Sequence, residues 1–154
     1  MKDNQKFKLI AHALIKINNK YLLIKRTKNK RGKRNSFPEY WDIPGGMVEN
    51  SELPSMAAIR ETKEEVNLDI KIITIVHEDS NYDVEKDTVF TRIVYQAELL
   101  EGQDENNIVL QLDEHSEYKL VNNINEIDKP VNYLYDAIEN SNIYNNGRTK
   151  YKKT

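Results

Sequence analysis

The sequence predicts a single layered domain of the α/β or α+β type. Short runs of β-forming residues alternate along the chain with two helix-like segments, which is typical of layered domains. The 154 residues, 38% of them hydrophobic, suit one globular core. Neither an internal repeat nor a long linker rich in Ser, Pro or Gly divides residues 1–154, so we expect one domain.

The chain is expected to open with a β-hairpin. Residues 7–16 and 20–25 are rich in aliphatic and aromatic side chains, and Asn18 and Asn19 separate them. Such a pair of short polar residues between two β-rich runs is a common hairpin connection. We therefore expect a strand, a tight turn and a second strand.

A helix is predicted over residues 51–67, which contain many strong helix formers. Ser51 is available as the N-cap, and Pro54 is tolerated in a first turn. Asn67 can adopt the left-handed conformation that a C-terminal cap requires. A second helix is expected over residues 130–140, beginning near a proline.

Three further strands are predicted. Residues 70–77 form a β-branched run, and residues 117–121 form a shorter, weaker one. Between 87 and 99 the odd positions are mostly apolar, whereas the even positions include Arg92 and Gln96. This period of two indicates a strand with one buried face.

Several classes of protein are excluded by composition. The chain has no cysteine and only three scattered histidines, so disulfides, thiolate sites and a structural zinc site are not expected. Its apolar stretches are far shorter than the roughly 20 residues of a membrane helix. The polar N-terminus lacks the ~7–15-residue apolar stretch of a secretory signal, so we expect a cytoplasmic protein without a membrane partner.

The net charge of −2 conceals opposite blocks of charge. Seven of the ten residues from 25 to 34 are basic, and the tail at residues 144–154 is polar and basic as well. We expect the tail to fray. Most of the basic run is expected to be a solvated loop, although it could steer an anionic substrate or touch RNA.

An acidic stripe lies on the first helix. Glu61, Glu64 and Glu65 stand at i, i+3 and i+4, so they share one helix face. Only Glu64 has a local basic partner, Arg60, and two carboxylates at ~6 Å repel by roughly 3 kcal/mol at an effective dielectric of 20. Three clustered carboxylates suit Mg²⁺, with Mn²⁺ as the alternative. The stripe could instead face water or pair with a distant Lys or Arg.

A glycine-containing turn precedes the acidic helix. Residues 41–46 read WDIPGG, and Glu49 and Glu52 follow in the loop. Glycines such as Gly45 and Gly46 let the backbone approach a ligand closely. A turn that leads into an acidic helix is unsuited to a bare phosphate, but it makes sense if metal ions bridge the phosphate and the carboxylates.

The segment GMVENSELPSMAAIRETKEEVNL at residues 46–68 resembles the Nudix box, which is a Gly, five residues, a Glu, seven residues and then REUxEExGU, where U is a bulky aliphatic residue. The matching positions are Gly46, Glu52, Arg60, Glu61, Glu64, Glu65 and Leu68. Thr62 replaces an aliphatic residue of the pattern, and Asn67 replaces its second glycine. Asn67 should still end the helix, and the Thr62 hydroxyl must find a partner.

The resemblance implies an α/β/α sandwich with a mixed β-sheet. It also implies hydrolysis of a nucleoside diphosphate linked to another moiety. Glu61, Glu64 and Glu65 would bind divalent metal ions, with the Gly46 carbonyl as a further ligand. Arg60 would orient the carboxylates through a salt bridge, and Glu52 would support them by hydrogen bonding.

The general base varies among proteins that share this box. Glu65 is one candidate here, and the stretch at residues 113–117, which includes Glu114, is another. Arg26 stands at the end of the second predicted strand, where an arginine of similar proteins often reaches substrate phosphates. Glu114 and Gly45 are further expected substrate contacts.

Aromatic residues follow the basic run. Phe37 and Tyr40 could stack on a base, whereas core packing is the expected role of Trp41. Because the basic run itself contains no aromatic residue, a nucleic-acid partner is not expected. The expected partner is a small nucleotide-type substrate, and either a monomer or a homodimer is compatible with the sequence.

The favoured activity is conversion of a nucleoside triphosphate into a monophosphate and pyrophosphate, as in antimutator enzymes of this family. A proline is typical of ADP-ribose enzymes at a position that would fall near Asp83, and this chain has none there. Tyr82 is out of register with the tyrosine of dinucleoside polyphosphate enzymes. Isopentenyl diphosphate isomerases share the fold but use a cysteine, which is absent. ADP-ribose, nucleotide sugars and dinucleoside polyphosphates remain alternative substrates. A non-catalytic nucleotide sensor is a further alternative, but the intact carboxylates favour an enzyme.

Overall fold

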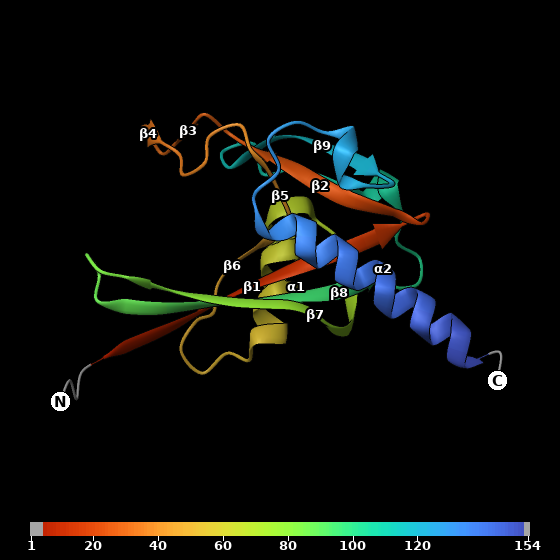
Figure 1. The fold of residues 1–154 in the computed structure, drawn as a ribbon. Coiled ribbons are helices and arrows are strands. Elements are labelled where there is room, and N and C mark those ends of the chain that lie inside the picture. Colours follow the sequence, from red (N-terminus) through yellow and green to blue (C-terminus); the bar gives the residue numbers. More distant parts are fainter. Residues whose placement is uncertain (1–4, 153–154) are drawn as a thin grey trace.

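The computed structural model describes residues 5–152 and shows a mixed β-sheet between two helices (Figure 1). The strands are β1 (Lys6–Ile17), β2 (Lys20–Arg26), β3 (Asn29–Lys30), β4 (Lys33–Arg34), β5 (Trp41–Asp42), β6 (Gly45–Met47), β7 (Ile70–Asp83), β8 (Thr88–Leu99) and β9 (His115–Val121). The α-helices are α1 (Pro54–Val66) and α2 (Tyr133–Lys152), and the short 3₁₀ helices are η1 (Glu105–Asn107) and η2 (Ile124–Glu126). No helix of this part of the chain is long and apolar enough to cross a membrane.

The main sheet has the order β5-β2-β1-β8-β7, with β6 paired to β1 and β9 paired to β2. β1 runs parallel to β8, and the other named pairs of the main sheet are antiparallel. One core cluster packs α1 against the sheet, and a second packs α2 against the opposite face. This arrangement is the expected α/β/α sandwich with a mixed sheet.

The hairpin and the C-terminal cap of the first helix are confirmed. Asn18 and Asn19 join β1 to β2 with φ values of 52° and 64°, so both adopt the left-handed turn conformation that asparagine tolerates. Asn67 has a φ of 63° and its N–H donates to the Lys63 carbonyl. Thr62 is buried, and its hydroxyl donates to the Ala58 carbonyl at 2.7 Å.

The predicted N-cap is wrong. Ser51 lies in the preceding turn with a φ of 66°, and Leu53 occupies the cap position without a side-chain cap hydrogen bond. The reason is Pro54, which fits the first helical position but forces the residue before it into an extended conformation. The helix therefore cannot begin before Pro54.

Two expectations for the second half of the chain are corrected. Helix α2 begins at Tyr133 and continues to Lys152, so it starts later and ends later than the helix predicted over residues 130–140. Its middle is anchored to the sheet, because Gln96 donates to Asn145 and Tyr21 donates to Ser141 and Asn142. The same helix covers the second face of β8, so residues 94–97 are buried on both faces and the prediction of one buried face is wrong there. Residues 153–154 of the tail lie outside the described range.

Candidate functional site

Helix α1 presents its carboxylates to the two glycines of β6. Gly45 donates its backbone N–H to Glu65 Oε2 at 3.1 Å. A Cβ atom added to Gly46 would lie only 2.7 Å from the carboxyl carbon of Glu61, so only glycine leaves room for that side chain. Because β6 pairs with β1 and α1 packs on the same sheet, the fold brings both carboxylates against one short strand.

Burial sets the charge of these two carboxyl groups. Glu65 is only 3% exposed, and burial followed by hydrogen bonding and repulsion from Glu61 raises its pKa to about 10. Burial also raises the pKa of Glu61. The protein without a bound cation therefore keeps a proton on this pair at neutral pH. A nearby cation would allow both groups to ionise.

Arg60 ties the loop before α1 to this pair. Its Nε and Nη2 atoms donate to the two carboxylate oxygens of Glu52 at 2.8 and 3.0 Å. Its Nη1 atom lies 3.0 Å from Glu61 Oε1 and 3.5 Å from Glu64 Oε2. The hydrogen bonds from Arg60 and the Glu49 backbone lower the pKa of Glu52 to about 2. One guanidinium thus fixes the position of several box carboxylates.

The donor set fits a hard divalent cation. Among residues 5–147, whose side chains the structure describes, no three Asp, Glu or His side chains converge around one point, because Arg60 holds Glu61 and Glu64 is more than half exposed. The Glu61–Glu65 pair nevertheless supplies adjacent carboxylate oxygens that repel each other when ionised. Oxygen-rich, negatively charged sites without thiolate or paired imidazole suit Mg²⁺ or Mn²⁺.

A cleft of about 630 Å³ opens beside the two glycines, which is within the size range of small-molecule sites. It extends from β6 across the sheet to the start of α2. Its lining includes Arg26, Phe37, Asp42, Gly45, Arg92 and Tyr133. The predicted site residues Arg26, Gly45 and Gly46 therefore face one common space.

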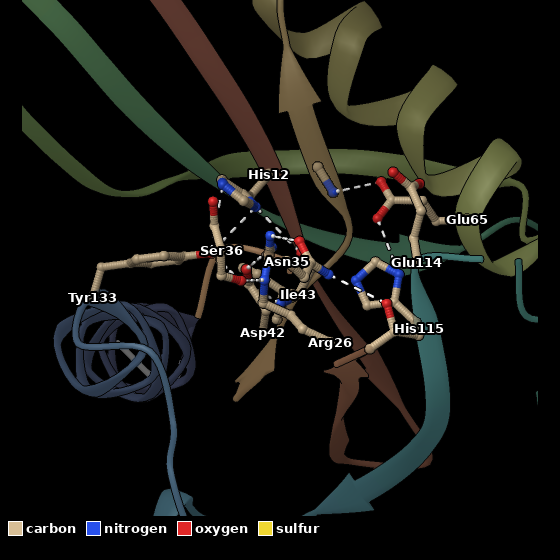
Figure 2. A network of polar contacts seen from close by, with 12 residues as sticks. His12, Arg26, Asn35, Ser36, Asp42, Ile43, Glu65, Glu114, His115 and Tyr133 are labelled. Atoms are coloured by element: carbon tan, nitrogen blue, oxygen red, sulfur yellow. Dashed lines mark hydrogen bonds and ion pairs between the residues drawn. The ribbon is translucent and has the colours of Figure 1, made fainter. Parts of the chain in front are cut away.

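Arg26 lines this cleft and is held by three hydrogen bonds (Figure 2). The register of β2 against β9 shifts between Lys25 and Arg26, and such a bulge redirects a side chain. The guanidinium donates to the Ser36 carbonyl at 2.7 Å, to Asn35 Oδ1 at 3.1 Å and to Asp42 Oδ2 at 3.2 Å.

Four residues that were not expected at the site from the sequence also line the cleft, namely His12, Asp42, Arg92 and Tyr133. The Tyr133 hydroxyl donates to Asp42, and the Arg92 guanidinium lies 4.2 Å from the centre of the Tyr133 ring. The one sequence signal is His12, a polar residue inside the otherwise apolar stretch at residues 9–15 of β1. Asp42, Arg92 and Tyr133 come from segments far apart in the sequence. The local sequence pattern around each residue does not predict that they meet.

The second candidate for the general base lies close to the first. His115 Nδ1 is 3.6 Å from Glu65 Oε1, and burial lowers the pKa of His115 to about 4. Glu114 forms an ion pair with Lys30 and adds to the repulsion that raises the pKa of Glu65. The stretch at residues 113–117 thus reaches the carboxylate pair.

The aromatic residues divide between the cleft and the core. Phe37 is 62% exposed and lines the cleft. Tyr40 packs edge-on against Phe37 with ring centres 5.6 Å apart, and it is not among the lining residues. Trp41 is 4% exposed and belongs to the α2-side core, which confirms its expected packing role. The basic run forms a small hairpin, β3–β4, that is mostly exposed.

The chain is similar to proteins of known family. A family model described as the NUDIX domain matches residues 7–138. An ADP-ribose pyrophosphatase of Methanocaldococcus jannaschii is 32% identical over 108 residues, which cover 66% of this chain and 60% of that protein. An 8-oxo-dGTP diphosphatase of Proteus vulgaris is 30% identical over 77 residues, which cover 49% of this chain and 63% of that protein. The chain thus spans less than two thirds of the length of either relative.

Solved structures resemble the fold. The crystal structure of a MutT protein from Methanosarcina mazei Go1 superimposes with a TM-score of 0.69 at 22% sequence identity, covering 92% of this chain and 97% of that one. At this identity the likeness concerns the arrangement of strands and helices.

Proposed function

Because the chain belongs to the Nudix family, whose domain model matches residues 7–138, we propose that it is a metal-dependent pyrophosphohydrolase. The favoured reaction converts a nucleoside triphosphate into a nucleoside monophosphate and pyrophosphate. The resemblance to an 8-oxo-dGTP diphosphatase supports this choice. The resemblance to an ADP-ribose pyrophosphatase supports ADP-ribose as a second candidate substrate.

One observation carries the proposal. Glu61 and Glu65 lie together against Gly45 and Gly46, and their raised pKa values indicate that both groups ionise together only with positive charge nearby. A Mg²⁺-bound diphosphate brings that positive charge, whereas a neutral ligand does not. A purely structural pair of carboxylates would be expected to have a cationic side chain beside both members, but Arg60 contacts Glu61 and not Glu65.

The proposed metal ligands are Glu61, Glu64, Glu65 and the Gly46 carbonyl. When bound, Mg²⁺ would neutralise the diphosphate and lower the pKa of the attacking water. Arg60 would keep Glu61 and Glu52 in place, because it hydrogen-bonds both. Arg26, which lines the cleft, would donate its remaining N–H groups to phosphate oxygens of the substrate.

The proposed chemical step is an in-line displacement. A bond forms between the water oxygen and a phosphorus of the diphosphate linkage, and the bridging P–O bond breaks. The water proton passes to a carboxylate, either Glu65 or Glu114. The departing phosphate group leaves with the electrons of the broken bond, so the two products are the nucleoside monophosphate and pyrophosphate.

A substrate panel tests the proposal. Nucleoside triphosphates, 8-oxo-dGTP, ADP-ribose, nucleotide sugars and dinucleoside polyphosphates are incubated with Mg²⁺, and the nucleotide products are separated by chromatography and measured, together with any pyrophosphate released. We expect the fastest turnover with a nucleoside triphosphate, and loss of turnover when EDTA removes the metal. Tight binding of a nucleotide without any hydrolysis across the panel would contradict the proposal and favour a nucleotide sensor.

Gly46→Ala should lower turnover while leaving the fold intact. The added Cβ would displace the Glu61 carboxylate, which is the flexible end of a side chain, so the loss of stability should stay near 1 kcal/mol. Turnover with Mg²⁺ should fall about 10–100-fold, and the midpoint of the Mg²⁺ dependence should rise. Gly147→Ala is the matched control, because a Cβ there meets no atom within 4 Å. Equal turnover of both variants would contradict the assigned contact.

A further inference from the structure

Arg26 has more N–H donors than the hydrogen bonds that hold it use. Its guanidinium carries five N–H groups, of which three have partners: the Ser36 carbonyl, Asn35 Oδ1 and Asp42 Oδ2. The side chain lines the cleft and is about a quarter exposed. The direction of its remaining N–H groups therefore depends on the groups that hold the guanidinium from behind.

Asp42 is the charged member of that frame. It is only 6% exposed, so its orientation is set by protein contacts. Its Oδ2 atom accepts from Arg26, while its Oδ1 atom accepts from the Ile43 backbone at 2.8 Å and from the Tyr133 hydroxyl. The Ile43 contact is local and fixes one oxygen only. Tyr133 supplies the long-range contact, from the first residue of α2.

Tyr133 is itself fixed by groups other than Asp42, among them His12, which lies beside it (Figure 2). Arg92 lies over its ring at 4.2 Å, and the His12 ring packs beside it with a centre-to-centre distance of 5.1 Å. The Tyr133 hydroxyl also lies 3.3 Å from His12 Nδ1. The ring therefore has a defined place even without the hydroxyl, which separates the packing role of this residue from its polar one.

We propose that Tyr133 is a positioning residue for substrate binding: its hydroxyl holds Asp42, and Asp42 holds Arg26 in the orientation that meets the substrate phosphates. The inference rests on the proposed function, since it assigns a purpose to the same cleft. It predicts an effect on ground-state binding, because the hydrogen-bond partners of Arg26 do not include Glu61 or Glu65.

The test compares Tyr133→Phe with Tyr135→Phe. Tyr135 lies two residues further along α2, and its side chain is exposed. With dGTP and Mg²⁺, Tyr133→Phe should raise KM about five- to tenfold and leave kcat within twofold. Tyr135→Phe should leave both constants unchanged. Arg26→Ala should raise KM as well, and adding Tyr133→Phe to it should have little further effect, because both changes remove one interaction. A fall in kcat at constant KM, or additive effects in the double variant, would overturn the inference.

A second measurement separates this inference from the proposed function. Hydrogen exchange of the Arg26 guanidinium N–H groups, assigned by their loss in Arg26→Lys, can be followed by NMR without substrate. Tyr133→Phe should accelerate that exchange about tenfold or more, because Arg26 loses a fixed partner, whereas Tyr135→Phe should not. Unchanged exchange would refute the positioning role. Absence of dGTP hydrolysis in the wild-type chain, with accelerated exchange in Tyr133→Phe, would refute the proposed substrate but retain the link from Tyr133 to Arg26.

Discussion

Glu65→Gln lowers turnover of the preferred nucleotide by a factor of about 10³ or more at saturating Mg²⁺, which is the loss expected when a metal ligand or general base is removed. Glutamine keeps the size of the side chain and its hydrogen bond from Gly45, so the fold should be retained. It removes the negative charge and the proton-accepting oxygen. The measurement is kcat with Mg²⁺ varied to saturation.

Glu101→Gln is the matched control, since Glu101 lies in an exposed turn. It should retain wild-type turnover. Glu64→Gln should have a smaller effect than Glu65→Gln, because Glu64 is more than half exposed and contacts Arg60 at 3.5 Å. A loss of less than tenfold in Glu65→Gln at saturating metal would remove Glu65 from the list of ligands and bases.

The same substitution should remove a pH dependence of the free energy of unfolding that the wild type shows when metal is absent. The pKa of Glu65 is about 10 in the folded chain and near 4.5 when unfolded, so the folded state holds a proton that the unfolded state releases. Stability therefore falls as pH rises between these two values. In EDTA the free energy of unfolding of the wild type should decrease by about 1 kcal/mol per pH unit between pH 7 and 9. Glu65→Gln should be nearly independent of pH over that window.

The window from pH 7 to 9 lies above the range in which His12, His115 and Glu52 titrate. The lowered pKa values of His12 and His115 act below about pH 6.5, where stability rises with pH. The lowered pKa of Glu52 acts between about 2 and 4.5, where stability is lost as pH falls. Chemical denaturation in EDTA at several pH values measures the slope. Equal slopes for the wild type and Glu65→Gln would contradict the raised pKa, and added Mg²⁺ should abolish the slope of the wild type.

Expectations that rest on local spacing were reliable. The shared helix face of Glu61 and Glu65 follows from 3.6 residues per turn, whereas Glu64 of the same predicted stripe is more than half exposed. The cap at Asn67 and the turn at Asn18 follow from the tolerance of asparagine for positive φ. These features depend on residues within one or two turns of one another. Errors arose where a neighbour overrode a local preference, as when Pro54 displaced the helix start from Ser51.

By itself, the sequence determined the family, the sandwich fold and the carboxylate face of the candidate site, because the box is a contiguous segment whose spacing is set by one helix. Tertiary structure alone decided the burial of β8, the length of α2 and the frame around Arg26. Tyr133 and Asp42 are 91 residues apart, and they meet only because α2 packs across the sheet from the box helix. Such contacts depend on how two layers dock, and no local periodicity encodes them.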